Sequence, residues 1–472
     1  MKTIASALLL LILVFPVWAQ EGSENFDDLF EGEILEEDGE PAAEESQEED
    51  LFESDLFEES AETEAAEEAA PEEAFLVSDQ LEWGGSFDLS LTAQVAATDY
   101  IAPWNKAFWN PDISSLTSVV SADLFFDARP NRDFRVFGKI KAAYRYPADP
   151  LSTDPPPGEW EAEIFELFSD FQIKDLLFFR AGKQTVQWGV GYFFSPADVL
   201  NLVSIDPEDP GADREGPIAL KTHFPFAADN AYLYLVANDI DKPYEIAVAP
   251  KVELLLGNYE LGIGGFYQYD LTPKGMLTLT GPLWDLDLFA EAMVQWGSDR
   301  TFVDFSPSPS SYTIEDQMLF SGTVGFSYLN SDWNLSLSTQ YFFNDQGYQE
   351  SYDYEVMFES TSDLLPLPPE TPAEAIITSA DLLYPGRHYL AASVGWSELL
   401  DSDFGLSLLY LANFSDGSGL ITPTVTWDPI DHVRLSTGLR ISYSDDPAGD
   451  EYAPTGGALA WTLGVSLGAG RF

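Results

Sequence analysis

Cysteine is absent from this chain of 472 residues, which excludes disulfides, thiol catalysis and thiolate metal sites. Histidine is nearly absent, since only His223, His388 and His432 are available for a metal cluster or a catalytic triad. No motif places a serine beside one of these histidines, as a hydrolase would require. We therefore expect neither an enzyme nor a bound metal or cofactor.

Basic residues are scarce as well, because 21 Lys and Arg stand against 81 Asp and Glu and give a formal charge of -60. Nucleic-acid binding depends on clustered Lys and Arg that replace the counterions of the phosphates. A chain with this balance repels the phosphate backbone. Nucleic acid is therefore excluded as a partner.

Long apolar runs are limited to the amino terminus. Residues 1–19 contain Lys2, an apolar core and a small residue, Ala19, before Gln20, which is the pattern of a secretory signal peptide. No later stretch approaches the roughly 18 uninterrupted apolar residues of a membrane-spanning helix. The sequence predicts export and a mature chain that begins at Gln20.

Residues 20–75 form an acidic segment, in which residues 21–75 contain 25 Asp and Glu and no Lys or Arg. Charge repulsion and a low apolar content predict that it is disordered. The tetrapeptide DLFE recurs at 28–31, 50–53 and 55–58. It is either a repeated docking motif for a periplasmic partner or a set of chance apolar residues in a spacer. The aromatic residues concerned are Phe30, Phe52 and Phe57.

From about residue 84 onward, apolar and polar residues alternate with period 2, which is typical of strands with one apolar face. In residues 283–297 the apolar face consists of Trp284, Leu286, Leu288, Ala290, Ala292, Val294 and Trp296. The other face carries Asp285, Asp287, Glu291 and Gln295. Tryptophan at both ends of the apolar face matches the aromatic girdles of a membrane barrel. We therefore expect lipid outside and water inside.

Short connections alternate with long ones, as periplasmic turns and external loops do in outer-membrane barrels. The sequence predicts an all-β fold over residues 76–472, a transmembrane antiparallel up-and-down β-barrel of about 18 strands, or about 16 if residues 270–282 are not a strand. Both termini would then be periplasmic. The predicted strands begin near residues 84, 116, 133, 159, 175, 217, 229, 244, 259, 275, 283, 315, 332, 387, 403, 419, 431 and 457.

The final segment, GGALAWTLGVSLGAGRF, is an amphipathic strand that ends in Phe472. It resembles the carboxy-terminal signal that the barrel-assembly machinery of the outer membrane recognises. Phe472 has the opposite parity to Trp461 and Leu463, and a β-bulge near residues 468–470 would restore the shared parity. The resemblance implies the assembly machinery as a partner, in addition to outer-membrane lipid.

A second segment, RAGKQTVQWGVGYFFSPADVLN over residues 180–201, contains R-x-G-x-Q, then W-G, then a D-x-x-N loop. It resembles a motif of porin-like outer-membrane β-barrel proteins of poorly defined function, of spirochaetal and proteobacterial type and distantly like alginate-export and phosphate-selective porins. The resemblance implies a channel in the cell outer membrane. It does not identify a solute.

The predicted strand 133–146 has its basic residues on the face opposite its apolar ones, so they should face the lumen. These residues are Arg135, Lys139, Lys141 and Arg145. Acids on the neighbouring strands could form cross-strand ion pairs with them, which is one interpretation. The other is a basic ladder, with acids facing it, that orients a polar solute. The acids are Asp123, Asp127, Glu159, Glu161 and Glu163.

The motif strand places Arg180 and Gln184 on the luminal face as well. The loop that follows, 189–215, is the third external loop and is more apolar than a solvated loop. In many porins the third loop folds inward and narrows the pore; the alternative here is a helical cap on the barrel rim. The candidate constriction residues are Trp188, Phe193, Phe194, Asp198 and Asn201.

Polar inner faces and the strand count predict a channel for passive diffusion of small polar solutes. Acidic mouths and paired interior cations would make it mildly cation-selective at low salt. The alternative is a surface adhesin or assembly scaffold, in which the loop 345–386 and the acidic segment act while the barrel is an anchor.

Overall fold

The structure is a computed structural model. It describes residues 81–95, 113–131, 133–148, 158–174, 176–238, 242–269, 271–304, 310–348, 384–400, 402–444, 450–452 and 459–471. The signal peptide, the acidic segment with Phe30, Phe52 and Phe57, and the terminal Phe472 lie outside the described residues, so the expectations about them stay predictions.

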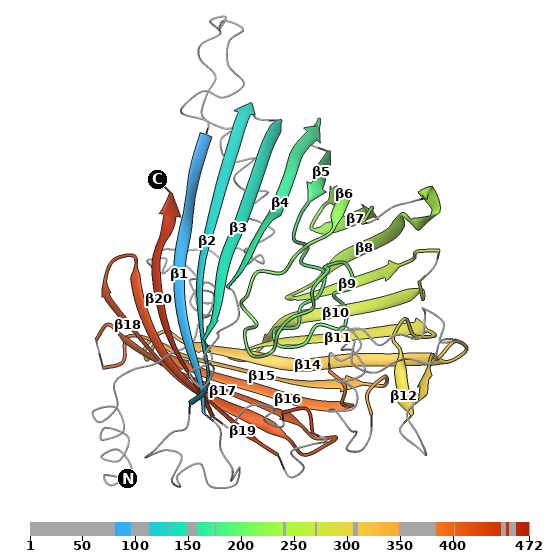
Figure 1. The fold of residues 1–472 in the computed structure, drawn as a ribbon. Coiled ribbons are helices and arrows are strands. Elements are labelled where there is room, and N and C mark those ends of the chain that lie inside the picture. The colour runs from blue at the N-terminus through green and yellow to red at the C-terminus, as the bar shows by residue number, and fades with distance from the viewer. Residues whose placement is uncertain are drawn as a thin grey trace, which may run out of the picture.

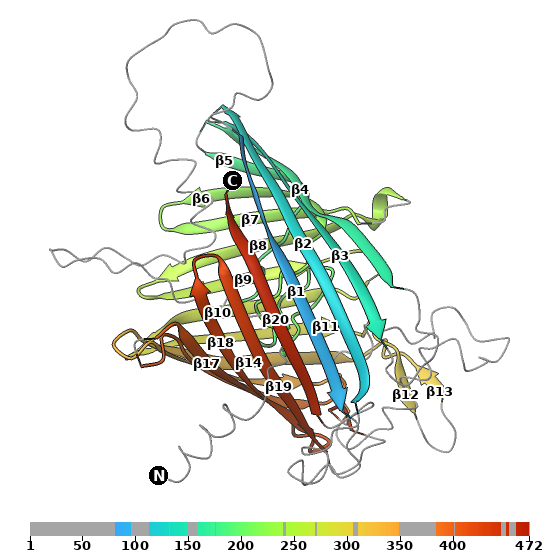
Figure 2. The same ribbon diagram turned by 60° about the vertical axis from the view of Figure 1, so that its left-hand side comes forward.

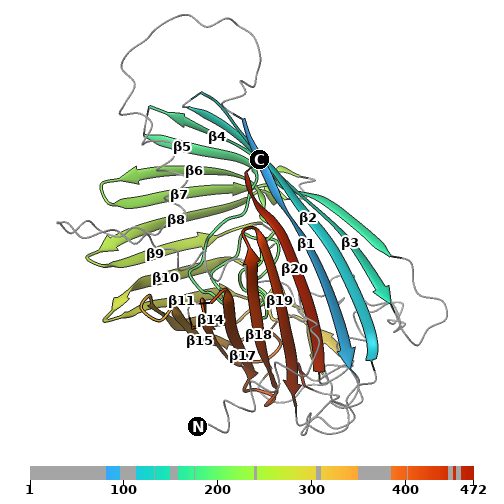
Figure 3. The same cartoon turned by 90° about the vertical axis from the view of Figure 1, so that its left-hand side faces the viewer.

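Eighteen strands form one closed antiparallel sheet, in which β1 pairs with β20 to complete the ring (Figures 2 and 3). The strands are β1 (Leu81–Val95), β2 (Ile113–Asn131), β3 (Phe134–Ala148), β4 (Glu159–Ile173), β5 (Leu177–Lys183), β6 (Ile218–Phe226), β7 (Asp229–Val236), β8 (Ala247–Leu256), β9 (Tyr259–Phe266), β10 (Lys274–Leu283), β11 (Leu286–Trp296), β14 (Met318–Asn330), β15 (Leu335–Asn344), β16 (His388–Trp396), β17 (Phe404–Asn413), β18 (Gly419–Ile430), β19 (Val433–Tyr443) and β20 (Leu459–Arg471). Every strand begins within three residues of its predicted position, and the 18-strand barrel is confirmed.

Smaller elements occur in the connections. The loop after β11 contains a two-stranded hairpin, β12 (Phe302–Asp304) and β13 (Ser310–Tyr312), which the sequence pattern did not predict. A 3-10 turn, η3 (Pro243–Glu245), precedes β8. Among the described residues, no helix has the length and apolar character needed to cross a membrane.

The two faces of the barrel wall follow the predicted period of 2. On β11, Glu291 and Gln295 point inward with exposed fractions of 4% and 5%, whereas Val294 and Trp296 point outward with 43% and 52%. Phe289, on the inward face, is also buried. An inner wall that faced only water would leave these side chains exposed, so protein covers this part of it.

The carboxy-terminal strand contains the expected bulge. Gly470 of β20 lies opposite Gly85 of β1, but Gly468 lies opposite the next residue, Ser86. Ala469 is therefore the extra residue that changes the parity of the strand. The predicted bulge at residues 468–470 is confirmed.

Candidate functional site: the inner wall and its inward loop

The connection between β5 and β6, residues 184–217, lies inside the ring of strands, and we call it the inward loop (Figure 1). It bonds to inward-facing side chains on strands far around the barrel, namely Glu291 of β11, Gln340 of β15 and Arg440 of β19. The expectation of an inward-folded third loop is confirmed, and the alternative of a cap on the rim is wrong.

The first part of the inward loop, residues 184–201, is the anchor segment, and it wraps around one carboxylate. Glu291 accepts hydrogen bonds from the backbone N–H of Gly191 at 2.5 Å and of Ala197 at 2.9 Å. It also accepts from the Ser195 hydroxyl at 2.9 Å and from the N–H of Val190. Converging N–H groups form a nest for an anion, and charge-assisted bonds are roughly twice as strong as neutral ones. Glu291 thus fixes the anchor segment to β11.

Two glycines allow this close approach. A Cβ atom on Gly189 would lie 2.0 Å from Ser195 Oγ and 2.5 Å from Glu291 Oε1. A Cβ atom on Gly191 would lie 2.0 Å from the carbonyl oxygen of Phe194. The W-G-V-G part of the sequence motif is therefore what the nest requires.

A second inward side chain, Gln340 of β15, bonds to the next residues of the anchor segment. Its Oε1 accepts from the N–H of Phe193 at 2.7 Å, and its Nε2 donates to the carbonyl of Phe194 at 2.5 Å. The Phe194 ring stacks on Phe342 with 5.1 Å between centroids and lies 5.6 Å from Tyr389. Phe193 and Phe194 are fully buried. Both therefore attach the loop to the wall, and neither ring exposes surface to a solute.

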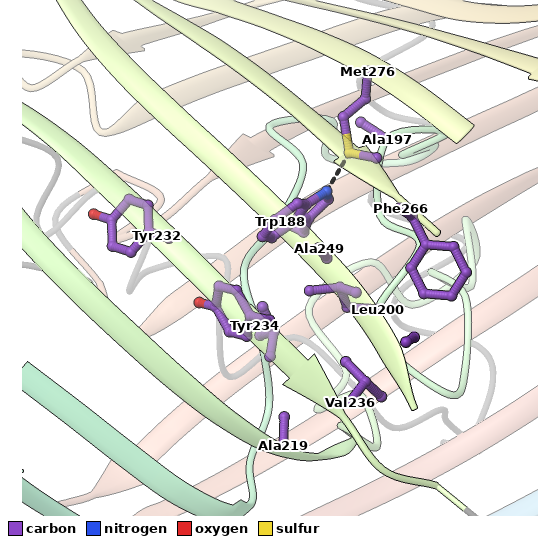
Figure 4. Close-up of a cluster of buried hydrophobic side chains, with 12 residues drawn as sticks. Trp188, Ala197, Leu200, Ala219, Tyr232, Tyr234, Val236, Ala249, Phe266 and Met276 are labelled. Carbon is purple, nitrogen blue, oxygen red and sulfur yellow. Dashed lines mark hydrogen bonds between the residues drawn. The ribbon is translucent and has the colours of Figure 1, made fainter. Parts of the chain in front are cut away.

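Trp188 attaches the start of the anchor segment to another part of the wall, on β7 to β10 (Figure 4). Its ring meets Tyr234 edge-on with 5.2 Å between centroids, and its Nε1 donates to the sulfur of Met276. The ammonium of Lys251 lies 5.5 Å from the ring centre. Because only 1% of Trp188 is exposed, it too is an anchoring residue.

The D-x-x-N pair braces the inward loop internally. Asn201 accepts from the N–H of Val186 at 3.0 Å and donates to Asp198 at 2.9 Å. Asp198 also forms an ion pair with Arg214, near the far end of the loop. Burial raises the pKa of Asp198 above its usual range, although Arg214 opposes this. The pair therefore joins the two ends of the loop.

Residues 203–213 form the acidic lobe, with four acids and no Lys or Arg. In its middle Glu208 forms a two-bond ion pair with Arg440 of β19, at 2.6 and 2.8 Å. At its last residue Asp213 lies 2.9 Å from Lys141 and also pairs with Lys139. Burial raises the pKa of Asp213, but the two lysines outweigh it, so the net pKa lies below the usual value. Asp213 is therefore charged at neutral pH.

The charged wall on β2 to β5 consists largely of paired groups. Arg135 lies 2.8 Å from Asp127 and 3.8 Å from Asp170, and Arg180 lies 2.8 Å from Asp170. Lys139 lies 3.3 Å from Asp123. The predicted pairing with the acids of β2 is confirmed.

The glutamates of β4 lie beside the basic row as predicted, with Glu163 opposite Lys141 and Glu159 opposite Arg145, but in the described part of the chain the predicted ion pairs with them are not formed. Within the described residues, no ion pair joins Glu159, Glu161 or Glu163 to the basic row. The register of β3 and β4 shifts between Lys139 and Ile140, so the inward parity of β4 changes only beyond these glutamates. The shift sets Asp170, which is 2% exposed, opposite Arg135 at the other end of the two strands.

Two further residues that were predicted to line the pore, Gln184 and Arg145, lie in different surroundings. Gln184 is buried, and its Nε2 donates to the carbonyl of Ala219 at 3.1 Å. Arg145 is exposed and lies opposite Glu159 in the β3–β4 register. Their predicted contribution to the lining of a pore stays a prediction.

Sequence reasoning gave no role to three residues that hold the inward loop: Glu291, Gln340 and Asp213. The available signal was a Glu and a Gln in the middle of strands, on the inward face and beside apolar residues. Long-range partners of this kind do not follow from spacing along the chain. Among the described residues there is also no group of three His, Asp or Glu arranged to bind a metal.

No protein-family model and no curated protein matches the chain. Solved structures do match, among them Acinetobacter baumannii OccAB1, with 8% identity, a TM-score of 0.43 and coverage of 86% of this chain and 100% of that one. Pseudomonas aeruginosa OccK8 (OprE) has 7% identity, a TM-score of 0.47 and coverage of 84% and 99%. Salmonella typhi OmpF in complex with daunomycin has 10% identity, a TM-score of 0.39 and coverage of 84% and 99%. These TM-scores are below 0.5, so the proposed function depends on the geometry of this barrel alone.

Proposed function

We propose that the chain is an outer-membrane channel for small polar solutes. The observation that carries the proposal is the contrast between the two faces of one closed 18-strand sheet. Outward side chains near both ends of the barrel are large, aromatic and exposed, as Trp284 at 87%, Trp333 at 71% and Trp160 at 77% show. Trp284 and Trp333 lie in the short turns, whereas Trp160 lies beside a long connection. Two aromatic girdles around an apolar band are the signature of a barrel in a bilayer.

The inner face supports a polar lumen. Its charged side chains are partly exposed, with fractions of 16% for the Arg135 side chain, 21% for Lys139 and 25% for Lys141. Charges cost much free energy when they face lipid and little when they face water. The inner wall therefore suits water and small polar solutes.

Conductance of the refolded full chain in a planar bilayer tests this function. Ohmic current that scales with the number of inserted barrels is the expected result. A stable, refolded barrel that never conducts, even after the inward loop is loosened by substitution, would reject the channel.

Two adjacent residues of β1 test which face meets lipid. Phe87 is 41% exposed on the outer face, and Ser86 points inward. Because the chain has no cysteine, each position can carry the single thiol of a variant. Phe87→Cys should react only with lipid-soluble reagents and Ser86→Cys with small water-soluble ones. The reverse pattern would contradict the orientation of the wall.

The direction of insertion is tested on intact cells. We propose that the long connections face the medium and that both termini face the periplasm, because short turns and chain ends share one end of the barrel. Added protease should cleave within residues 345–386. Cleavage at the turn 257–258 would show the opposite orientation.

A second candidate function is a surface scaffold or adhesin whose barrel is only an anchor. The inward loop favours it in one respect, since the loop contacts strands from β3 around to β19 and thus reduces the free lumen. A barrel that stays closed in every variant of the loop would support this function.

A further inference from the structure

The acidic lobe, residues 203–213, is attached differently from the anchor segment. Its base is closed, because the N–H of Leu202 donates to the carbonyl of Glu215 at 2.8 Å and Thr185 Oγ1 donates to the carbonyl of Arg214 at 3.0 Å. Beyond this base the lobe reaches from β3, where Asp213 pairs, to β19, where Glu208 pairs. In the ring order of the strands it therefore passes in front of β2, β1 and β20.

The contacts that hold the lobe to these strands are ion pairs in partly solvated surroundings. The side chain of Asp213 is 40% exposed, and those of Glu208 and Arg440 are 29% and 27% exposed. Part of the lobe is also exposed to solvent, since Val203 is 52% exposed. Two apolar residues, Ile205 and Pro207, are buried, and the carbonyl of Ile205 accepts from Tyr384 on the adjoining external loop.

Such pairs weaken as salt rises. The screening length falls from about 10 Å at 0.1 M salt to about 3 Å at 1 M, and exposed pairs contribute only about 0–1 kcal/mol. Salt thus acts on the lobe and leaves the buried anchor segment in place.

We infer that the acidic lobe is a salt-sensitive gate, held across the β19–β3 side of the lumen by the Glu208–Arg440 and Asp213–Lys139/Lys141 ion pairs. The inference rests on the proposed channel function. Breaking either contact frees the lobe from one side of the lumen, widens the path beside β20, β1 and β2, and raises the conductance.

Two substitutions of opposite charge separate the gate from ordinary electrostatics. Asp213→Asn removes a negative charge and Arg440→Gln removes a positive one, but each breaks one contact of the lobe. The gate predicts that both raise the single-channel conductance at about 0.1 M KCl, where the pairs are least screened. A direct effect of charge on permeating ions would change the conductance in opposite directions.

Salt dependence gives an independent readout. For the unchanged protein, conductance divided by bath conductivity should rise between about 0.1 M and about 1 M KCl as the lobe is released. Acidic mouths alone would make this ratio fall, because they concentrate cations most strongly at low salt. The double variant Asp213→Asn/Arg440→Gln should lose the rise.

The matched control is Asp299→Asn, which breaks the 2.9 Å ion pair with Lys274 outside the inward loop. It should leave the rise intact, and far-UV circular dichroism should show the same β content in all variants. A conducting unchanged protein whose ratio falls with salt, with single variants that move in opposite directions, would overturn the gate and leave the channel standing. Absence of current in the folded double variant as well would reject both.

Discussion

The anchor segment and the acidic lobe belong to one loop but are held by different forces. The anchor segment places Trp188, Phe193 and Phe194 out of contact with water and surrounds the carboxylate of Glu291 with donors. The lobe has four acids and is attached to the wall mainly by partly exposed ion pairs. Burial protects an interaction from salt, whereas exposure makes it respond to the solution. A single loop can therefore combine a permanent attachment with an adjustable one.

The largest expected effect comes from removing the acceptor of the nest. Glu291→Ala leaves three backbone N–H groups without their carboxylate, at a cost of about 1–3 kcal/mol each. We expect the anchor segment to detach, so that added protease cleaves near residues 190–197 and channel current becomes larger and noisier. Glu291→Gln, which keeps one acceptor oxygen, should show a smaller change. If Glu291→Ala resists protease like the unchanged chain, the nest does not hold the loop.

The next largest effect separates apolar attachment from charge. Phe194→Ala removes a fully buried ring from its stack on Phe342 and should cost about 3–5 kcal/mol. Leu202→Ala is the control at the residue between the anchor segment and the lobe, because that side chain is 50% exposed and its loss should cost about 0.5 kcal/mol or less. Amide hydrogen exchange of residues 190–197 measures both. Equal protection of residues 190–197 in the two variants would show that buried apolar packing does not hold the anchor segment.

The barrel was predictable from the sequence because every strand has one face toward lipid and one toward the lumen. Each strand therefore shows the alternation without reference to its neighbours. Period 2 and alternating connection lengths gave every strand within three residues, and the parity of Phe472 gave the bulge of β20. These are local properties of the chain. The β12–β13 hairpin was missed because no alternation marks strands as short as Phe302–Asp304.

The partners of the site were predictable only in part. Asp127 was found as a partner of Arg135 because the two lie on consecutive strands, eight residues apart. Asp213 lies 72 residues beyond Lys141 in a loop that crosses the lumen, and no pattern in the chain links them. The register shift between β3 and β4 likewise sets Asp170 opposite Arg135, and the alternation pattern did not predict this bulge.

A smaller effect should distinguish the response of the inward loop to pH from its response to salt. Burial raises the pKa of Glu451, in the loop after β19, to about 8, and Asp416 raises it while Tyr389, Asn413 and Arg300 lower it. Its Oε2 accepts from Tyr389 at 2.7 Å, and Tyr389 lies against Phe194 of the anchor segment. pH should therefore act on the anchor side of the loop and salt on the lobe.

The direction of the pH effect on stability follows from the raised pKa of Glu451. The unfolded carboxyl has a pKa of about 4.3, so the folded protein holds one proton more between about pH 4.3 and about pH 8. The stabilisation is fully present below the unfolded pKa and is lost as the pH rises through 8. Urea midpoints should fall over this range, and Glu451→Gln should remove that part of the fall. An unchanged pH profile in Glu451→Gln would contradict the assignment.

The smallest expected effect concerns ion selectivity. Lys139 and Lys141 are paired with Asp123 and Asp213, so their field in the lumen is short-ranged. Residues 76–472 hold 56 acids and 20 bases, and the excess at the mouths should make the pore mildly cation-selective at low salt. Lys139→Gln/Lys141→Gln should raise the conductance, since it frees the β3 end of the lobe. It should increase the cation-to-anion permeability ratio by less than about twofold, because the lost cations were already neutralised. Reversal potentials in a salt gradient measure the ratio. A strong anion preference in the unchanged protein, abolished by this double change, would show that the two lysines act on solutes directly and that their pairing with Asp213 is not what sets the selectivity.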